Sequence, residues 1–333
     1  MDQASPYTAS LHEQMGPGVQ VDEYRAGKLV HRYDIWHVHF PEALLNIRNP
    51  ALAAFKLLVF LGMMDLVRAR GGKIVWTVHN LKSHDALHPE LEARHYRRLL
   101  PRIDGVISLS STALTLAYEK FPRLRQLPAV VIPHGHYRNR FQRRETDSRN
   151  ELGIAENARV ILFFGEVRTY KNVDGLVRAF RNVAIPNALL VIAGRPKSAE
   201  FAECIQQEAA GDSRVRLNLR FIAAEDAPKF FAAADLVVLP YRNILNSGAA
   251  LLSLSFSRPL LVPDLGSMGD LKADFGADWV RTFSGNVESQ ELENALDWAA
   301  QPRPVVCPIP EKYRWDNIRA ETVRFYRRVL GHS

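Results

Sequence analysis

Two strand-to-helix corners in the second half of the chain carry residue types that bind a diphosphate. In ILFFGEVRTYKNVDGLVRAF, residues 161–180, a buried strand is expected to end at Gly165, a loop carries Arg168 and Lys171, and a helix follows. Glycine lets the backbone approach a ligand, and the first turn of the helix offers unpaired N–H groups to an anion. The two cations could bind a diphosphate and stabilise it as a leaving group. Alone, this corner could equally be a loop with two exposed cations.

The second corner lies at residues 235–263, DLVVLPYRNILNSGAALLSLSFSRPLLVP. A predicted strand is followed by a polar loop that contains Arg242, and a helix is expected to begin at about Ser247 and Gly248. Its first amides could hold phosphate oxygens. Two such corners in one domain predict that the second half of the chain binds a nucleotide diphosphate.

Another group of candidates lies in the first half, which holds ten of the eleven histidines. In YDIWHVHFPE, His37 and His39 alternate with Val38, so both should point to one face of a sheet, with Glu42 just after the strand. The candidates near the ends of the other strands are His79, Asn80, Asp85 and His134. Any single histidine could be structural, but three such motifs at the carboxyl ends of strands favour a site.

The elements that must position these residues alternate short apolar runs with amphipathic stretches, which is typical of an α/β protein with parallel sheets. The predicted strands are Tyr33–Phe40, Lys73–His79, Gly105–Leu109, Ala129–Pro133, Arg159–Phe164, Ala188–Ala193, Val215–Phe221, Leu236–Pro240 and Leu260–Pro263. The predicted helices are Ala51–Arg68, Glu90–Leu100, Thr112–Phe121, Val173–Val183, Ala224–Ala233 and Ala249–Ser257.

The expected architecture is two Rossmann-like, doubly wound domains that face each other across a cleft. The polar, Arg-rich stretch Arg138–Asn150 has no apolar period and is interpreted as a linker. The first domain is therefore predicted at residues 1–150 and the second at residues 151–312, followed by a terminal segment at 313–333. In such domains ligands bind at the carboxyl ends of the strands.

Length and composition agree with two globular domains in a reducing cytoplasm. A chain of 333 residues with 47% hydrophobic and 24% charged residues and two cysteines is neither disordered, a coiled coil nor a disulfide-stapled miniprotein. The net charge of +7 lies in residues 1–150, which hold 21 Lys and Arg against 14 Asp and Glu, whereas the remainder holds 22 of each. This surplus could serve nucleic acid, an anionic membrane or an acidic substrate. Because the sequence has no recognisable nucleic-acid-binding motif, no nucleic-acid partner is expected.

The motifs of the second half resemble those of GT-B glycosyltransferases, in particular the large family 4 group. Gly165, Arg168 and Lys171 resemble the diphosphate loop of that group in its G-x-x-R-x-Y-K form. The segments that resemble its later signatures are Leu189–Gly194, Phe230–Asp235, Leu239–Tyr241 and Trp315–Tyr326. The last resembles the terminal helix that crosses back to the first domain. The resemblance implies that residues 151–312 bind a nucleotide diphosphate sugar and that the first domain binds the acceptor.

One departure from this family bears on the stereochemistry of transfer. Retaining family 4 enzymes carry a Glu-x7-Glu pair in this region, but this sequence has no carboxylate from Tyr241 to Val262 and has Leu252 at the second position. The form PYRxILxSGxALLxLSFxRP instead resembles an inverting branch that includes β-mannosyltransferases of exopolysaccharide assembly. That resemblance implies GDP-mannose as the donor and a lipid-linked glycan as the acceptor. A retaining family 4 enzyme that uses a UDP-sugar is the alternative; in neither case is a metal or cofactor expected.

An inverting transfer needs a base near the acceptor hydroxyl, which the first domain should supply. The candidates are Glu42, Asp85 and then His79, which corresponds to the histidine of a T-x-H-[DN] motif in GT-B relatives. The residues expected to line the acceptor side of the cleft are Tyr7, His37, His39, Asn80, His134 and Arg242. Ser5–Pro6–Tyr7 resembles the N-P-Y segment that borders the acceptor in relatives. Because almost nothing precedes it here, either the chain starts too late or the first strand of this domain is missing.

The most apolar segment, Ala51–Val67, bears on the expected location of the protein. It is shorter than the roughly 20 residues of a spanning helix and carries Lys56 and Asp65, so a buried or surface helix is expected. The nearby arginines are Arg94, Arg97, Arg98 and Arg102. Together they could dock on an anionic membrane surface as an apolar patch with a basic rim, although a core helix beside a solvated basic face explains the pattern equally well. The expected location is cytoplasmic, peripheral on the inner face of the plasma membrane.

A metal-dependent hydrolase is the alternative from another class. His37 and His39 resemble paired strand ligands, and His84 and His88 have the spacing of a helical ligand pair. The second half, however, contains His332 as its one histidine. The GT-B pattern explains that half better.

Overall fold

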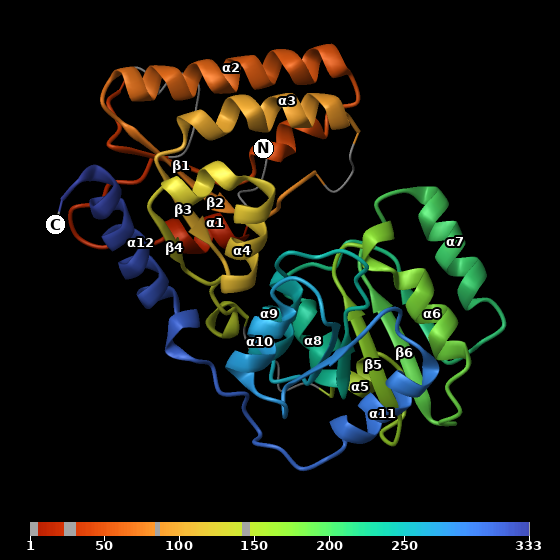
Figure 1. Cartoon of the computed structure of the whole chain (residues 1–333). Helices are drawn as coiled ribbons and strands as arrows, with labels where there is room; N and C mark the ends of the chain where they lie inside the picture. The colour runs from red at the N-terminus through yellow and green to blue at the C-terminus, as the bar shows by residue number, and fades with distance from the viewer. Residues whose placement is uncertain (1–5, 23–30, 84–86, 142–146, 333) are drawn as a thin grey trace. The chain divides into compact units, whose positions relative to one another are not determined.

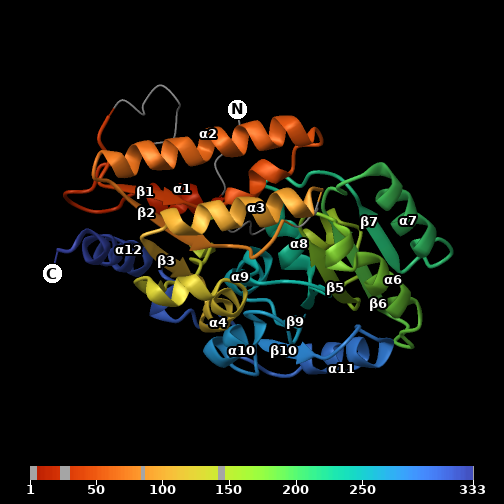
Figure 2. The same cartoon turned by 45° about the horizontal axis from the view of Figure 1, so that its top comes forward.

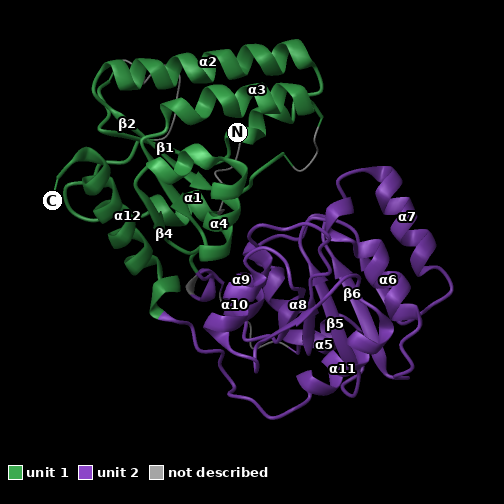
Figure 3. Ribbon diagram, viewed as in Figure 1, with its two compact units in different colours: residues 1–135, 311–333 green, residues 136–310 purple. Residues whose placement is uncertain are grey.

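The computed structural model describes residues 6–22, 31–83, 87–141 and 147–332, and the chain divides into two compact units (Figure 3). Unit 1 comprises Met1–Gly135 and Glu311–Ser333, and unit 2 comprises His136–Pro310. The predicted boundary at residue 150 thus lies inside unit 2, together with the whole stretch Arg138–Asn150 that is interpreted as a linker. One reason is Arg149, which donates from one nitrogen to both carboxylate oxygens of Asp235 at 2.9 Å.

Unit 1 is built on a sheet of four parallel strands in the order β1-β2-β3-β4. The strands are β1 (Ile35–Val38), β2 (Lys73–Val78), β3 (Gly105–Ser108) and β4 (Ala129–Val131). The α-helices are α1 (Pro6–His12), α2 (Pro50–Ala69), α3 (Pro89–Leu99), α4 (Ser111–Lys120) and α12 (Trp315–Leu330). Short 3-10 helices are η2 (Pro41–Leu45), η3 (Leu100–Arg102), η4 (Pro122–Gln126) and η7 (Glu311–Tyr313).

Helix α2 is capped locally and exposes much of its apolar surface. The Asn49 side chain accepts from Ala51 N at 3.0 Å and from Leu52 N at 3.1 Å, which satisfies two of the free amides of the first turn. The residues that α2 buries form one stripe: Ala53, Leu57, Leu61, Met64 and Val67. Figure 1 and Figure 2 both show α3 beside α2.

The terminal helix α12 packs with α1 on the core of unit 1. Their buried cluster includes Tyr7 and Leu11 of α1, Val75 of β2, and Phe325 of α12. The fit at β3 is tight, because a Cβ on Gly105 would lie 2.6 Å from a methyl carbon of Val329. Residues from the two ends of the chain therefore form one core.

Unit 2 contains a sheet of six parallel strands in the order β10-β9-β8-β5-β6-β7. The strands are β5 (Arg159–Phe164), β6 (Ala188–Ala193), β7 (Val215–Asn218), β8 (Leu236–Val238), β9 (Leu260–Pro263) and β10 (Val280–Phe283). The helices are η5 (Arg138–Arg140), α5 (Ser148–Glu151), η6 (Thr169–Lys171), α6 (Val173–Arg181), α7 (Ala199–Ala209), α8 (Ala227–Ala233), α9 (Gly248–Ser255), α10 (Met268–Phe275) and α11 (Ser289–Ala299). The strand order reverses between β5 and β8, and ligands of such sheets bind at the carboxyl ends beside this point.

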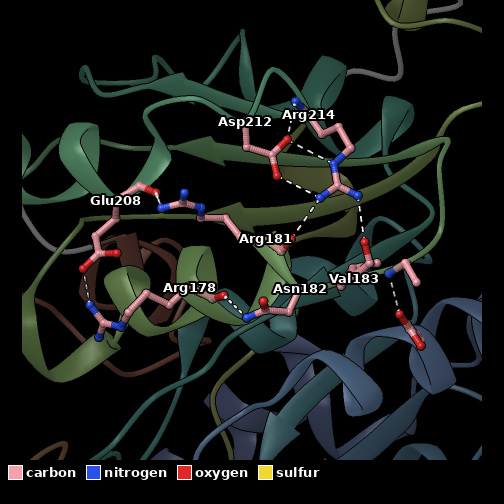
Figure 4. A network of polar contacts seen from close by, with 9 residues as sticks. Arg178, Arg181, Asn182, Val183, Glu208, Asp212 and Arg214 are labelled. Atoms are coloured by element: carbon pink, nitrogen blue, oxygen red, sulfur yellow. Dashed lines mark hydrogen bonds and ion pairs between the residues drawn. The ribbon is translucent and has the colours of Figure 1, made fainter.

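A network of polar contacts holds the carboxyl end of α6 (Figure 4). Arg214, just before β7, donates to the Val183 carbonyl at 2.8 Å and to the Asp212 carboxylate at 2.8 and 3.0 Å. Within the same region, Arg178 of α6 donates to Glu208 of α7 at 2.6 Å. These contacts fix the carboxyl end of α6, whereas its amino end follows the loop that carries Arg168 and Lys171.

All nine predicted strands are present, most with shorter ends, and the six predicted helices are also present. The sequence-based interpretation does not include β10, α1, α5, α7, α10 and α11, and α5 begins within the stretch interpreted as a linker. Strand β10 buries its end residues Val280 and Phe283, but the exposed Arg281 and the half-buried Thr282 lie between them. It therefore lacks the continuous apolar run of strands such as β5 and β6.

Candidate active site

The first strand-to-helix corner, at residues 161–180, depends on the close approach of two glycines. Gly165 follows β5 with a φ of +126°, a conformation that favours glycine. Its carbonyl oxygen would lie 1.8 Å from a Cβ on Gly194, the residue after β6. A side chain at Gly194 would separate the two loops, and the positive φ of Gly165 disfavours a side chain there. The two glycines therefore set the path of the loop that carries the cations.

The two cations of this loop have different surroundings. Arg168 is paired with Glu166, whose carboxylate oxygen lies 2.7 Å from one of its terminal nitrogens. Lys171 is half-buried, and the loss of solvent around its ammonium group lowers the pKa of this group to about 8. Its Nζ lies 5.7 Å from the centre of the Tyr241 ring, on the second corner. Asn172 then adopts the left-handed conformation, with a φ of 54°, as the chain enters α6.

The second corner lies against the first within unit 2. The Arg242 amide donates to the Tyr170 carbonyl at 2.8 Å, which joins the two loops directly. The Ser247 side chain accepts from Ala250 N at 3.2 Å and so caps α9, which begins at Gly248. The structure thus brings together the residues of both loops that are predicted to bind the nucleotide diphosphate. The Arg242 side chain is exposed and helps to line a polar cavity of about 410 Å³ in the same unit.

In unit 1, the predicted histidines form a single cluster at the carboxyl ends of β1 and β2. The rings of His37 and His39 lie 4.1 Å apart, as their alternation on β1 predicts. His39 Nδ1 lies 3.1 Å from His79 Nε2, within hydrogen-bond distance. Tyr7 of α1 is buried among them, with its ring centre 4.9 Å from that of His79 and 4.8 Å from that of His134.

The terminal helix contributes two aromatic side chains that the sequence-based interpretation did not assign to the site. Tyr326 OH lies 2.6 Å from His37 Nδ1, and Thr77 Oγ1 lies 2.6 Å from His37 Nε2. Trp315 packs on the backbone after His134, so closely that a Cβ on Gly135 would lie 2.2 Å from its ring. The signal for Trp315 and Tyr326 was their place in the terminal-helix motif, which gave no indication of these contacts.

The histidine cluster is electrically neutral around pH 7. Burial is the largest cause in each case: it lowers the pKa of His39 to about 3 and that of His134 to about 4, and it holds those of His37 and His79 well below their usual value. Neighbouring imidazoles add to the shifts of His37, His39 and His79. These side chains can therefore donate and accept hydrogen bonds as neutral imidazoles.

Glu42 is the buried carboxylate beside this cluster. It is 5% exposed, and Asn80 Nδ2 donates to its Oε1 at 2.8 Å. Burial raises the pKa of Glu42 to about 7, a value suited to a group that must take up a proton around neutral pH. Asp85, the other predicted carboxylate, lies outside the described residues, as does Ser5.

Three of the histidines also have the spacing of a metal site. His12, His37 and His39 each offer a ligand atom, and these atoms all lie within 4.8 Å of one another. Both ring nitrogens of His37 already contact hydroxyl groups, so a metal ion would have to displace Thr77 or Tyr326. Of the suggested helical pair, His84 lies outside the described residues, and His88 contacts the Ile47 carbonyl at 2.7 Å.

Known proteins are similar to this chain in sequence. The family described as glycosyl transferases group 1 matches residues 144–252. The chain is 30% identical over 329 residues, 98% of its length and 89% of the relative, to a GDP-mannose:glycolipid 4-beta-D-mannosyltransferase of Xanthomonas campestris pv. campestris.

Two solved structures are similar in fold. Sucrose-phosphate synthase from Thermosynechococcus elongatus has a TM-score of 0.65 and 18% identity, with 90% of this chain and 75% of that chain covered. Anabaena Alr3699/HepE in complex with UDP-glucose has a TM-score of 0.62 and 18% identity, with 90% and 78% covered. The fold is that of a GT-B glycosyltransferase. The chain belongs to the group 1 glycosyltransferase family, and the Xanthomonas mannosyltransferase is a relative over nearly its whole length. The family expected from the motifs is thus confirmed.

Proposed function

We propose that this glycosyltransferase moves mannose from GDP-mannose to a lipid-linked glycan, with inversion at the anomeric carbon. One observation supports this choice of substrates. The 30% identity to the Xanthomonas enzyme extends over 98% of the chain, so both units are similar in sequence to that enzyme. Since that relative is named for GDP-mannose and a glycolipid, the same classes of donor and acceptor are proposed here.

The proposed donor site uses the two corners of unit 2. Arg168 and Lys171 meet the charge of the diphosphate, and the first amides of α9 offer further donors at Gly248. As the sugar leaves, negative charge grows on the diphosphate, and these same groups stabilise it. The cations supply this stabilisation without a metal ion.

The proposed base is Glu42 of unit 1. It removes a proton from the acceptor hydroxyl as that oxygen attacks the anomeric carbon and the bond to the diphosphate breaks. The raised pKa of Glu42 suits it to this step, and Asn80 holds the carboxylate in place. The absence of a carboxylate from Tyr241 to Val262 supports inversion, because the second corner lacks the Glu-x7-Glu pair of retaining relatives.

The test is a transfer assay with GDP-mannose and UDP-glucose as alternative donors and a polyprenyl-diphosphate-linked oligosaccharide as acceptor. The proposal predicts transfer from GDP-mannose and a β-linked product by NMR. It also predicts that Lys171→Ala abolishes transfer while the circular dichroism spectrum stays unchanged, whereas Lys272→Ala, at an exposed lysine of α10, remains active. An α-linked product from UDP-glucose alone would favour the retaining alternative.

We further propose that unit 1 docks on the inner, anionic face of the plasma membrane through α2 and α3. Among the described residues, α2 is the one helix long and apolar enough to cross a membrane, and 28% of its apolar window is buried. Phe55 is 62% exposed and Leu58 is 55% exposed. The adjacent helix α3 carries exposed arginines: Arg94, Arg97 and Arg98. An apolar surface beside cations matches the chemistry of an anionic interface, where a lipid-linked acceptor resides.

A further inference from the structure

The arginine expected to bind the donor diphosphate is already bonded to a carboxylate of its own loop. Arg168 Nε donates to Glu166 Oε2 at 2.9 Å, and one terminal nitrogen of the same guanidinium lies 2.7 Å from that oxygen. These two nitrogens form one edge of the guanidinium, an edge that can also take phosphate oxygens. Glu166 is 55% exposed and Arg168 is 21% exposed, so the carboxylate lies on the more open side of the pair.

Glu166 is under the influence of three cations from two loops. Partial burial raises its pKa, but Arg168, Lys171 and Lys197 together lower it below the usual value. Lys197 belongs to the loop after β6, and its amide donates to the Val167 carbonyl at 3.0 Å. A β-bridge between Val167 and Pro196 holds the same two loops together. The Glu166 carboxylate thus occupies a cationic environment of the kind that binds phosphate.

We propose that Glu166 is an internal competitor for the donor diphosphate. It holds Arg168 while the site is empty and releases it when the diphosphate binds, a step that rests on the proposed function of this loop. A diphosphate carries more charge and more acceptor oxygens than a carboxylate, so it can displace Glu166 and also reach Lys197. The competition weakens the binding of both the nucleotide-sugar substrate and the nucleotide product, and it therefore speeds product release.

The experiment compares Glu166→Gln with the unaltered protein, using GDP and UDP as probes in titration calorimetry. Glu166→Gln should lower the Kd for GDP by about tenfold, because it removes both the competing anion and its repulsion of the phosphates. Stopped-flow displacement should show slower release of GDP. Exposed Glu203 of α7 provides the matched control: Glu203→Gln removes the same charge from unit 2 and should change the Kd by less than about twofold.

A double-mutant cycle separates competition for Arg168 from a general effect of charge. In an Arg168→Ala background, Glu166→Gln should give a much smaller gain in affinity than in the unaltered protein. An equal gain in both backgrounds, or unchanged or weaker GDP binding by Glu166→Gln alone, overturns the proposal. If neither the unaltered protein nor Glu166→Gln binds GDP or UDP, the proposed function of the loop fails instead. A gain in GDP affinity from Glu166→Gln that largely disappears in the Arg168→Ala background supports the competition.

Discussion

Tyr326 on the last helix contacts His37 on the first strand at 2.6 Å, although 289 positions separate them in the sequence. On its other side, His37 contacts Thr77 at 2.6 Å, and Thr77 in turn bonds to the Tyr7 hydroxyl. Four polar groups from α1, β1, β2 and α12 therefore form a continuous chain inside unit 1. Helix α12 does more than cover the sheet, because it fixes the orientation of an imidazole in the histidine cluster.

Replacement of Tyr326 by Phe tests the contribution of this contact to stability. The substitution keeps the ring but leaves a buried His37 nitrogen without its partner, which should cost about 1–3 kcal/mol of the free energy of unfolding. Urea denaturation of the full chain, followed by tryptophan fluorescence, measures the loss. Tyr118→Phe on α4 is the matched control, because Tyr118 stacks with Arg125 through its ring and should lose little. Equal stability of the two variants would contradict a structural role for the Tyr326 hydroxyl.

The strands that position the site could be predicted because their sequences are locally distinctive. Val160–Phe164 and Ala188–Ala193 are continuous, largely buried apolar runs in unit 2, and strands β5 and β6 have the predicted bounds. The donor loop was identifiable for the same reason, since Gly165, Arg168 and Lys171 lie within one short segment. Local patterns are enough where one segment supplies both the element and the side chains.

The remaining contacts could not be predicted because they depend on tertiary structure. Tyr326 approaches His37 only when α12 packs on the sheet, and no spacing within either segment encodes that contact. The pairing of Glu166 with Arg168 lies in the loop after β5, where no regular period indicates which charged side chains contact each other. Helix α1, which carries Tyr7, is short, and the motif that identifies Tyr7 does not predict a helix.

The pH dependence of transfer should reveal whether Asn80 tunes Glu42. Burial raises the pKa of Glu42 to about 7, and the hydrogen bond from Asn80 works in the opposite direction. A base must be deprotonated, so kcat/KM should rise with pH through about 7. Asn80→Ala removes the bond that favours the carboxylate, and the rising limb should move to higher pH by about one unit.

The position of this limb, not the size of the rate, is the diagnostic quantity, because Asn80 is also expected near the acceptor. Ser83→Ala is the control: it breaks a neighbouring hydrogen bond, from Ser83 Oγ to Asn46 Oδ1 at 2.9 Å, without touching Glu42. Its limb should coincide with that of the unaltered protein. A limb that stays in place in Asn80→Ala would exclude Glu42 as the group whose ionisation controls transfer.

Nucleotide binding should have a separate pH dependence that comes from Lys171. Burial lowers its pKa to about 8, and only the protonated form attracts a diphosphate. The affinity for GDP should therefore fall as pH rises through 8, and binding near this pH should take up protons, measurable by calorimetry in buffers with different ionisation enthalpies. Lys171→Met should weaken GDP binding by about 10- to 100-fold and remove this proton uptake. A Lys272→Met control should keep the uptake, because Lys171 is still present. Persistence of the uptake in Lys171→Met would assign it to another group.

Vesicle binding should depend on the exposed face of α2. Phe55 and Leu58 do not contribute to the buried stripe of the helix, so a double substitution to Ser should leave the fold intact. Loss of two apolar side chains at an interface should reduce co-sedimentation with vesicles of mixed phosphatidylglycerol and phosphatidylethanolamine by at least about tenfold. Phe221→Ser is the control, because Phe221 is 66% exposed on unit 2, away from α2 in the sequence and in a different unit. An equal loss of co-sedimentation in this control would indicate nonspecific membrane binding by exposed aromatic side chains.

Higher salt should also weaken vesicle binding, because it screens the arginines of α3 from the anionic lipids. A salt-independent interaction would count against an anionic surface.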